Sequence, residues 1–189
     1  MRWFAWLGCA GLLASAGCGP QTSIPQGVQV HFSPGGAPTG AVVEALGQAT
    51  NTVLVQAYSF TSAPIAQALV NARRRGVKTI VILDGSQRTE KYSEADFLAH
   101  NDIPTLIDAR HAIAHNKVII IDGYVVLTGS FNFTKAAEEK NAENLLVIND
   151  PALAAQYTRN WQAHEAHSEP YERDARSDER PARREKLRY

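Results

Sequence analysis

The chain has 189 residues, which is enough for one domain with a substantial hydrophobic core. Hydrophobic residues make up 44% of the sequence and charged residues 20%, an ordinary composition for a globular protein. The formal net charge is +0, because 19 basic residues balance 19 acidic ones. This balance argues against a tight duplex-DNA binder, which usually carries a basic surface.

The first 18 residues have the pattern of an export leader. Arg2 precedes an apolar run that is short for a bilayer-spanning helix and suits a secretory signal peptide. Residues 14–16 (ASA) match a signal-peptidase cleavage pattern, while residues 16–18 resemble the end of a bacterial lipoprotein box with Cys18 as the lipidated residue. An uncleaved anchor is the third interpretation. All three predict export, to the periplasm or the outer surface, with a membrane tether at Cys18 in the lipoprotein case.

The rest of the chain divides into a linker, a domain and a tail. Both cysteines, Cys9 and Cys18, lie in the leader, so the domain has neither a disulfide nor thiol chemistry. Turn-forming residues dominate 19–27, which we predict to be a linker. Residues 28–167 form the predicted catalytic domain. Residues 168–189 carry mixed charge and few apolar side chains, which predicts a charged, disordered tail.

Strand-like and helix-like patterns alternate through the predicted domain. We predict helices at 40–49, 62–76, 93–101 and 152–167, and strands at 28–34, 51–60, 77–84, 103–109, 115–122, 124–130 and 141–150. Gly123 lies between two of these strands and predicts a tight hairpin, which requires antiparallel pairing. The expected fold is therefore α/β, a single domain with a mixed β-sheet flanked by helices on both faces.

Polar residues gather around one strongly apolar strand, in HNKVIIIDGYVVLTGSFNFT (115–134). His115 and Lys117 are two apart, so on a strand they face the same side. Asn132 follows the strand that returns through the hairpin, so it can come close to His115. A lysine ammonium suits a phosphate oxygen, and the Asn132 amide and the Ser130 hydroxyl can donate to others.

Such a set predicts phosphoryl-transfer chemistry. A histidine can attack phosphorus or carry a proton near neutral pH. No cluster of carboxylates accompanies the motif to hold a divalent cation, so we expect neither a metal nor a cofactor there.

The spacing His-x-Lys-x4-Asp-x6-Gly-Ser-x-Asn resembles the HKD motif of the phospholipase D superfamily. The matching residues are His115, Lys117, Asp122, Gly129, Ser130 and Asn132, and the similarity continues through 135–144. Across residues 28–161 the chain is most similar to small secreted bacterial endonucleases that carry one motif per chain. The resemblance implies a phospholipase D-like fold and hydrolysis of phosphodiester bonds.

The resemblance also implies roles for individual residues. His115 would be the nucleophile, forming a phosphohistidine intermediate, and the same histidine of a second subunit would protonate the leaving oxygen. Lys117, Ser130 and Asn132 would bind the phosphate. Glu143 occupies the position of a carboxylate that orients the histidine.

Two motif residues are expected to be structural, and the motif count implies a dimer. Asp122 lies five residues from Lys117, on the opposite face of the strand, and we expect it to stabilise the hairpin or neighbouring strands. Gly129 is likewise a structural motif position. Because the chain has a single His-x-Lys, the resemblance implies a homodimer with the active site at the two-fold interface.

Three functions remain open from the sequence. The first is a metal-independent phosphodiesterase that cleaves nucleic acid, an endonuclease. The second is a phospholipase D acting on phosphatidylcholine-type lipids, and the third is a catalytically silent accessory protein. The motif recognises the phosphodiester and not the groups that it joins, so it does not separate the first two.

Other residues have weaker patterns. His164 and His167 are one helical turn apart and could share a metal, but no third ligand is evident in the sequence. His111 could line the cleft, but we expect it in a surface loop. Tyr58 and Phe60 could lie at the mouth of the site, but we expect them in the core.

Overall fold

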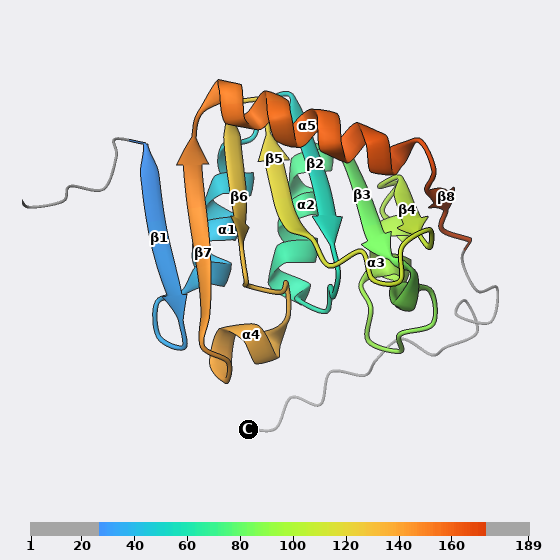
Figure 1. Cartoon of the computed structure of the whole chain (residues 1–189), viewed down its shortest axis with the longest axis horizontal. Coiled ribbons are helices and arrows are strands. Elements are labelled where there is room, and N and C mark those ends of the chain that lie inside the picture. The colour runs from blue at the N-terminus through green and yellow to red at the C-terminus, as the bar shows by residue number, and fades with distance from the viewer. Residues whose placement is uncertain (1–26, 173–189) are drawn as a thin grey trace, which may run out of the picture.

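A computed structural model describes residues 27–172, which are built around one eight-stranded sheet (Figure 1). The sheet order is β1-β7-β6-β5-β2-β3-β4-β8. The strands are β1 (Val28–Ser33), β2 (Thr52–Ala57), β3 (Lys78–Asp84), β4 (Thr105–Asp108), β5 (Lys117–Ile121), β6 (Val125–Gly129), β7 (Glu143–Asn149) and β8 (Glu169–Pro170). Only β2–β3 and β3–β4 pair in parallel, so the predicted mixed sheet is confirmed. The predicted leader, the linker up to residue 26 and the tail from 173 lie outside the described residues.

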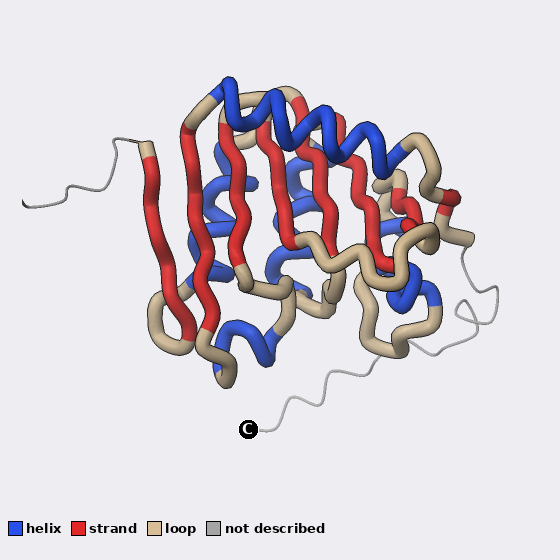
Figure 2. Tube along the Cα trace, viewed as in Figure 1, coloured by secondary structure: helices blue, strands red, loops and turns tan. Residues whose placement is uncertain are grey.

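Helices cover both faces of the sheet, as expected. They are α1 (Pro38–Gln48), α2 (Ala63–Arg74), the 3-10 helix η1 (Gly85–Arg88), α3 (Ala95–His100), α4 (Lys135–Glu139) and α5 (Pro151–Glu165). Helices α1 and α2 lie behind the sheet, and α5 crosses its front (Figures 1 and 2). Within residues 27–172, no helix has the length and apolar character needed to cross a bilayer.

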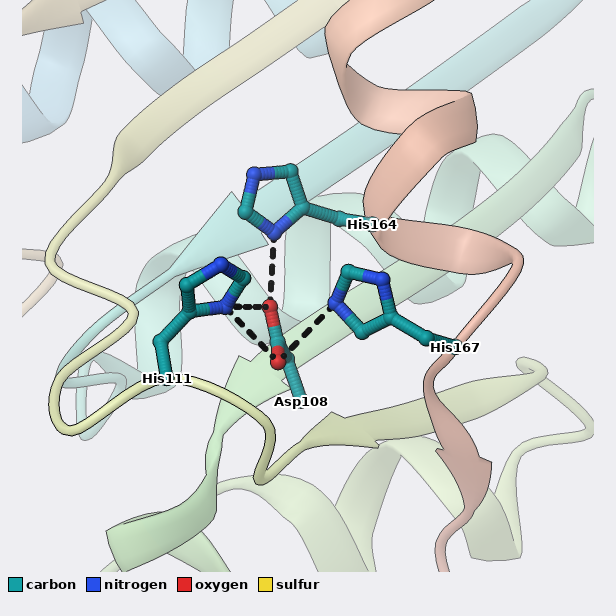
Figure 3. Close-up of side chains that lie close together, drawn as sticks. All are labelled: Asp108, His111, His164 and His167. Atoms are coloured by element: carbon teal, nitrogen blue, oxygen red, sulfur yellow. Dashed lines mark hydrogen bonds and ion pairs between the residues drawn. The ribbon is translucent and has the colours of Figure 1, made fainter.

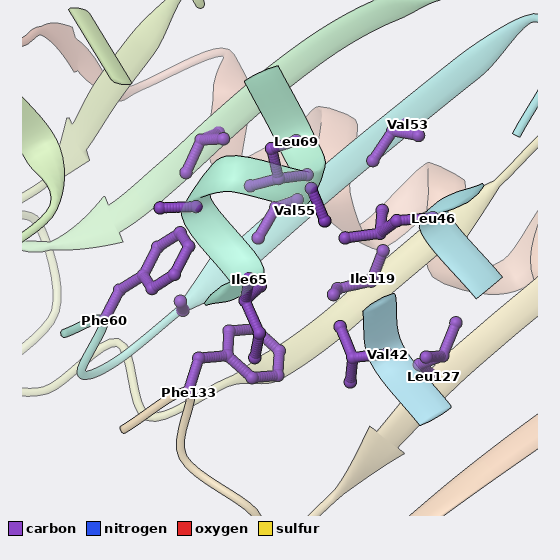
Figure 4. Packing of buried hydrophobic residues seen from close by; sticks show 14 of the residues in the cluster. Val42, Leu46, Val53, Val55, Phe60, Ile65, Leu69, Ile119, Leu127 and Phe133 are labelled. Atoms are coloured by element: carbon purple, nitrogen blue, oxygen red, sulfur yellow. The ribbon is translucent and has the colours of Figure 1, made fainter. Parts of the chain in front are cut away.

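The β-branched run of β5 is apolar throughout because the sheet is buried on both faces. Ile119 and Ile121 point into the larger core, which β2, α1 and α2 also line (Figure 4). Val118 and Ile120 point to the other face, against Trp161 of α5. The buried Trp161 indole donates a hydrogen bond to the Val55 carbonyl oxygen (2.9 Å), which fixes α5 to the centre of the sheet.

A tight turn joins β5 to β6, as the Asp-Gly pair predicts. Asp122 and Gly123 both have positive φ (55° and 65°), and the Tyr124 N–H donates to the Ile121 carbonyl at 3.0 Å. The Asp122 carboxylate accepts hydrogen bonds from the backbone N–H groups of residues 50–52 and from a threonine hydroxyl, at 2.8–2.9 Å. It therefore joins the turn to the start of β2.

The ends of the predicted elements are shifted, and two of these differences concern the site and the C-terminal segment. The predicted strand 115–122 is shorter, since β5 begins at Lys117 and His115 lies in the preceding loop. Residues 169–171, predicted as part of the tail, pair with β4 through β8, and the Tyr171 N–H donates to the Thr105 carbonyl at 2.8 Å. Backbone hydrogen bonds hold residues 169–171 against β4. The side chains of this edge strand are polar, so the sequence pattern does not indicate a strand here.

Candidate active site

Apart from Asp122, which lies in the turn at the other end of β5, the motif residues lie at one edge of the sheet. Strands β5 and β7 begin at this edge. Strand β6 is antiparallel to both and ends there. Strand β2 runs antiparallel to β5, so its C-terminal end reaches the same edge. Strand geometry alone therefore places Tyr58, His115, Lys117, Ser130 and Glu143 along this edge.

Tyr58 organises the two catalytic candidates. Its ring centre lies 4.6 Å from that of the exposed His115 imidazole and 5.2 Å from Lys117 Nζ. Lys117 Nζ also donates to the His115 carbonyl oxygen at 2.9 Å. His115 and Lys117 thus share a side of the sheet. The expectation that Tyr58 belongs to the core is wrong, since the ring is half-buried beside these residues, whereas Phe60 is fully buried as expected.

The Lys117 ammonium sits in an unusual environment for a charge. The residue is 6% exposed. Burial lowers the pKa of Lys117, and the nearby Glu143 carboxylate offsets part of that effect. A lysine held this way loses little hydration when it binds an anion, because most of its water is already absent.

The segment after β6 approaches β7 closely. A Cβ on Gly129 would collide with the Asn144 carbonyl oxygen, so this position needs glycine. The Ser130 hydroxyl accepts hydrogen bonds from the Asn144 backbone N–H (3.1 Å) and side-chain amide (3.3 Å). Phe131 and Phe133 are fully buried and fix the backbone on either side of Asn132. Within residues 27–172, the buried Oδ1 of Asn132 has no hydrogen-bond partner.

Glu143 begins β7 near Lys117. Its carboxylate accepts a hydrogen bond from the Asn141 side chain at 3.0 Å. No hydrogen bond joins it to His115 within the described part of the chain, so its orienting role stays a prediction.

A carboxylate that no sequence motif indicated holds the loop before His115. Asp84, at the end of β3, is 5% exposed. Its two oxygens accept hydrogen bonds from the Ala114 N–H (2.6 Å) and the Ser86 N–H (2.9 Å). The position at the end of a buried parallel strand was visible in the sequence, but its partner 30 residues away was not.

A second carboxylate, Asp108 at the end of β4, was also missed. It contacts His111, His164 and His167, so His164 in α5 and His167 in the turn after α5 have partners that their spacing alone did not predict. His111 is in a loop, as expected, and its side chain is 45% exposed. These four residues are the only group of three or more metal-ligating side chains in residues 27–172, and the group does not include His115.

At this edge of the sheet, an exposed imidazole lies beside a desolvated ammonium, and the segment after β6 brings the Ser130 hydroxyl and the Asn132 amide to the same edge. This combination can bind a phosphodiester and attack it, and it defines a class of histidine-dependent phosphodiesterases. A family model described as "Cardiolipin synthase, PLD-like domain" matches residues 42–164. The chain belongs to this phospholipase D-like family of phosphodiesterases.

Individual relatives agree with this membership. A protein of Rickettsia typhi named phospholipase D is 43% identical over 143 residues, which are 74% of this chain and 70% of the relative. A mitochondrial cardiolipin hydrolase of Chlamydomonas reinhardtii is 33% identical over 61% of this chain and 52% of its own length. The crystal structure of Nuc from Salmonella typhimurium, a phospholipase D family member, has 41% identity and a TM-score of 0.75 and covers 77% of this chain and 98% of its own. These matches confirm the phospholipase D-like fold.

Proposed function

We propose that this protein is a metal-independent endonuclease, which hydrolyses nucleic-acid phosphodiesters through a phosphohistidine at His115. The observation that carries the proposal is the exposed His115 ring beside the nearly buried Lys117 ammonium, on an open edge of the sheet. Lys117, Ser130 and Asn132 would hold the non-bridging phosphate oxygens. Asp122 and Gly129 would act only through the fold.

The chemistry follows from these positions in two steps. A ring nitrogen of His115 attacks phosphorus, the bond to the leaving oxygen breaks, and a second imidazole gives that oxygen a proton. Water then attacks the phosphohistidine and gives its proton to the second imidazole, which frees His115. The lysine charge stabilises the negative charge of both transition states, so no metal ion is required for either step.

The second imidazole has to come from another copy of the chain, because the motif supplies one histidine. Exposed apolar side chains surround the edge. Ile113, two residues before His115, is 56% exposed, and Phe32, paired with Asn144, is 63% exposed. A two-fold homodimer that covers these side chains would bring two His115 rings together.

Nucleic acid is the favoured substrate because the short chain with a single motif resembles the small secreted bacterial endonucleases. The neutral net charge fits weak, salt-sensitive contacts with single strands better than tight duplex binding.

A phospholipid is the second candidate, favoured by the relatives named phospholipase D and cardiolipin hydrolase. A lipid tether at Cys18, with the protein exported to the periplasm or outer surface, would place the enzyme near such a substrate. The accessory-protein hypothesis is disfavoured because His115, Lys117 and Asn132 are all present.

The test is hydrolysis in excess EDTA by the wild type and by His115→Ala. The substrates are plasmid DNA, single-stranded DNA, RNA and phosphatidylcholine vesicles. We expect EDTA-resistant nucleic-acid cleavage that His115→Ala abolishes. Cleavage of the vesicles alone would establish the phospholipase, no cleavage at all would favour the accessory protein, and an active His115→Ala would exclude His115 as the nucleophile.

A further inference from the structure

Three imidazole rings converge on one buried carboxylate, in a cluster that contains none of the motif residues (Figure 3). The Asp108 side chain is fully buried, and His164 Nδ1 lies 2.6 Å from its Oδ2. His111 Nδ1 and His167 Nε2 each lie 3.2 Å from a carboxylate oxygen. One ligand atom from each of the four residues falls within 4.8 Å of the other three.

We propose that Asp108, His111, His164 and His167 form a structural site for a divalent transition metal of the zinc type. Three imidazole nitrogens and one carboxylate oxygen are a donor set that suits Zn²⁺ and excludes the hard cations Mg²⁺ and Ca²⁺. Tetrahedral zinc with ligands at about 2.0–2.1 Å separates the ligand atoms by about 3.3 Å. The site reaches this geometry when the carboxylate contacts lengthen and the imidazole nitrogens close in slightly.

The surroundings are also those of a metal site. The Arg110 N–H donates to Asp108 Oδ1 at 3.1 Å and orients the carboxylate, as an outer-shell partner does. His164 and His167 are 16% and 19% exposed, whereas His111 faces solvent, which leaves an entry path on its side.

Metal binding would replace the hydrogen bonds within the cluster. Each nitrogen that faces the carboxylate must give up its proton to accept the metal. A neutral ring takes the tautomer with its proton on the other nitrogen, and a protonated ring releases one proton to solvent. No bond of a substrate is made or broken at this site, because four protein ligands close the coordination shell.

The site has a clear mechanical consequence for the catalytic loop. His111 lies in the loop 109–116, four residues before His115, while His164 is in the last turn of α5 and His167 lies in the turn that follows it. A metal ion would therefore tie the loop to both α5 and β4. Together with the hydrogen bond between Asp84 and Ala114, it would restrict the motion of the residues that lead into His115.

The experiment is a zinc titration of the full-length chain after EDTA treatment and removal of the chelator. Calorimetry should give one Zn²⁺ per chain, and Co²⁺ should produce the visible absorption band of a four-coordinate ion. Zn²⁺ should raise the midpoint of thermal unfolding and slow amide hydrogen exchange in residues 109–116.

Variants distinguish this site from other sources of zinc binding, such as the leader cysteines. His111→Ala and His164→Ala should each weaken binding at least tenfold and remove the thermal shift, and Asp108→Asn should do the same. His100→Ala, which alters an exposed histidine of α3, and His115→Ala should both bind zinc as the wild type does. His111 is half exposed, so His111→Ala keeps the core intact, and far-ultraviolet circular dichroism checks the fold.

Two results would overturn the proposal. One is a wild-type chain that binds no stoichiometric zinc and shows no thermal shift. The other is a folded His111→Ala and a folded His164→Ala that both bind zinc as tightly as the wild type does.

Discussion

Lys117 links burial to a measurable pH dependence. Because burial lowers its pKa below the ordinary value of 10.5, the ammonium loses its proton earlier than an exposed lysine does as the pH rises. We predict that kcat/KM falls as the pH rises through this lowered pKa, since a neutral amine no longer stabilises the phosphate charge. The pH profile of kcat/KM on the substrate identified in the EDTA assay measures this effect.

Activity at high pH could fall because Lys117 loses its proton or because the protein unfolds. The effect of Lys117 on the free energy of unfolding distinguishes the two causes. Between the lowered folded-state pKa and 10.5, the unfolded chain binds more protons at Lys117 than the folded chain does. The contribution of this residue to the free energy of unfolding therefore rises with pH in that window. An alkaline limb that follows the urea midpoint downward would mean that unfolding, and not Lys117, limits the rate.

Asp122 contributes to stability and not to catalysis. Burial raises the pKa of this carboxyl, but the hydrogen bonds from residues 50–52 outweigh it and hold the pKa below 3.8. The stabilisation is thus present above 3.8 and is lost as the pH falls through the folded-state pKa. We predict that Asp122→Asn lowers the free energy of unfolding by about 1–3 kcal/mol at pH 7, with kcat unchanged.

Urea denaturation at several pH values tests this. The difference between wild type and Asp122→Asn should shrink as the pH falls below 3.8, because the wild-type carboxyl becomes neutral. A difference that stays constant through the acid range would contradict the assigned role.

At the residue scale, local sequence patterns predicted well which residues of the segment from His115 to Asn132 come together at one edge of the sheet. They predicted poorly the contacts between residues far apart in the sequence. The spacing from His115 to Asn132 describes one hairpin, and strand alternation is enough to predict that its ends meet. Asp108 and its partners His164 and His167 are 56 and 59 residues apart, so no local pattern connects them. The contacts of Tyr58 likewise depend on the pairing of β2 with β5.

At the scale of elements, the loop before β5 is held by carboxylates at the ends of β3 and β4. Asp84→Asn should weaken the hydrogen bond from the Ala114 N–H, because the acceptor loses its charge. We predict that kcat falls about 10- to 100-fold while KM changes little, since the position of His115 suffers more than phosphate binding. Ser86→Ala is the matched control, because only the backbone of this exposed residue contacts Asp84. Steady-state kinetics give kcat and KM for both variants. If Asp84→Asn has the same kcat as Ser86→Ala, Asp84 does not position His115.

Elements with a strong hydrophobic period were predictable, and short ones were not. The seven predicted strands and four predicted helices all exist, with shifted ends. Helix α4 has five residues and β8 two, too few for a period to be recognised. In α5, the apolar face with Leu153, Tyr157 and Trp161 packs on the sheet as the pattern indicates.

At the scale of the whole molecule, one chain supplies an exposed half of the proposed active site. We predict a homodimer by analytical ultracentrifugation, with Ile113 in the interface. Ile113→Asp would bury an unpaired charge there at a cost of about 3 kcal/mol, which raises the dimer dissociation constant about 100-fold. Activity should fall with dissociation and recover at high protein concentration.

Tyr124→Asp is the control for this prediction. The side chain is 49% exposed, comparable to Ile113, but lies in the turn at the opposite edge of the sheet. It should leave both the dimer and the activity unchanged. A monomeric wild type with full activity would contradict the shared site.

The decisive measurement is the activity of a heterodimer with one wild-type chain and one His115→Ala chain, co-expressed with two different tags and isolated by sequential affinity steps. If each reaction needs His115 from both chains, the heterodimer has no more activity than the His115→Ala homodimer, although it remains dimeric and folded. If each chain works alone, the heterodimer keeps about half of the wild-type activity, and a catalytic site shared across the two-fold axis is excluded.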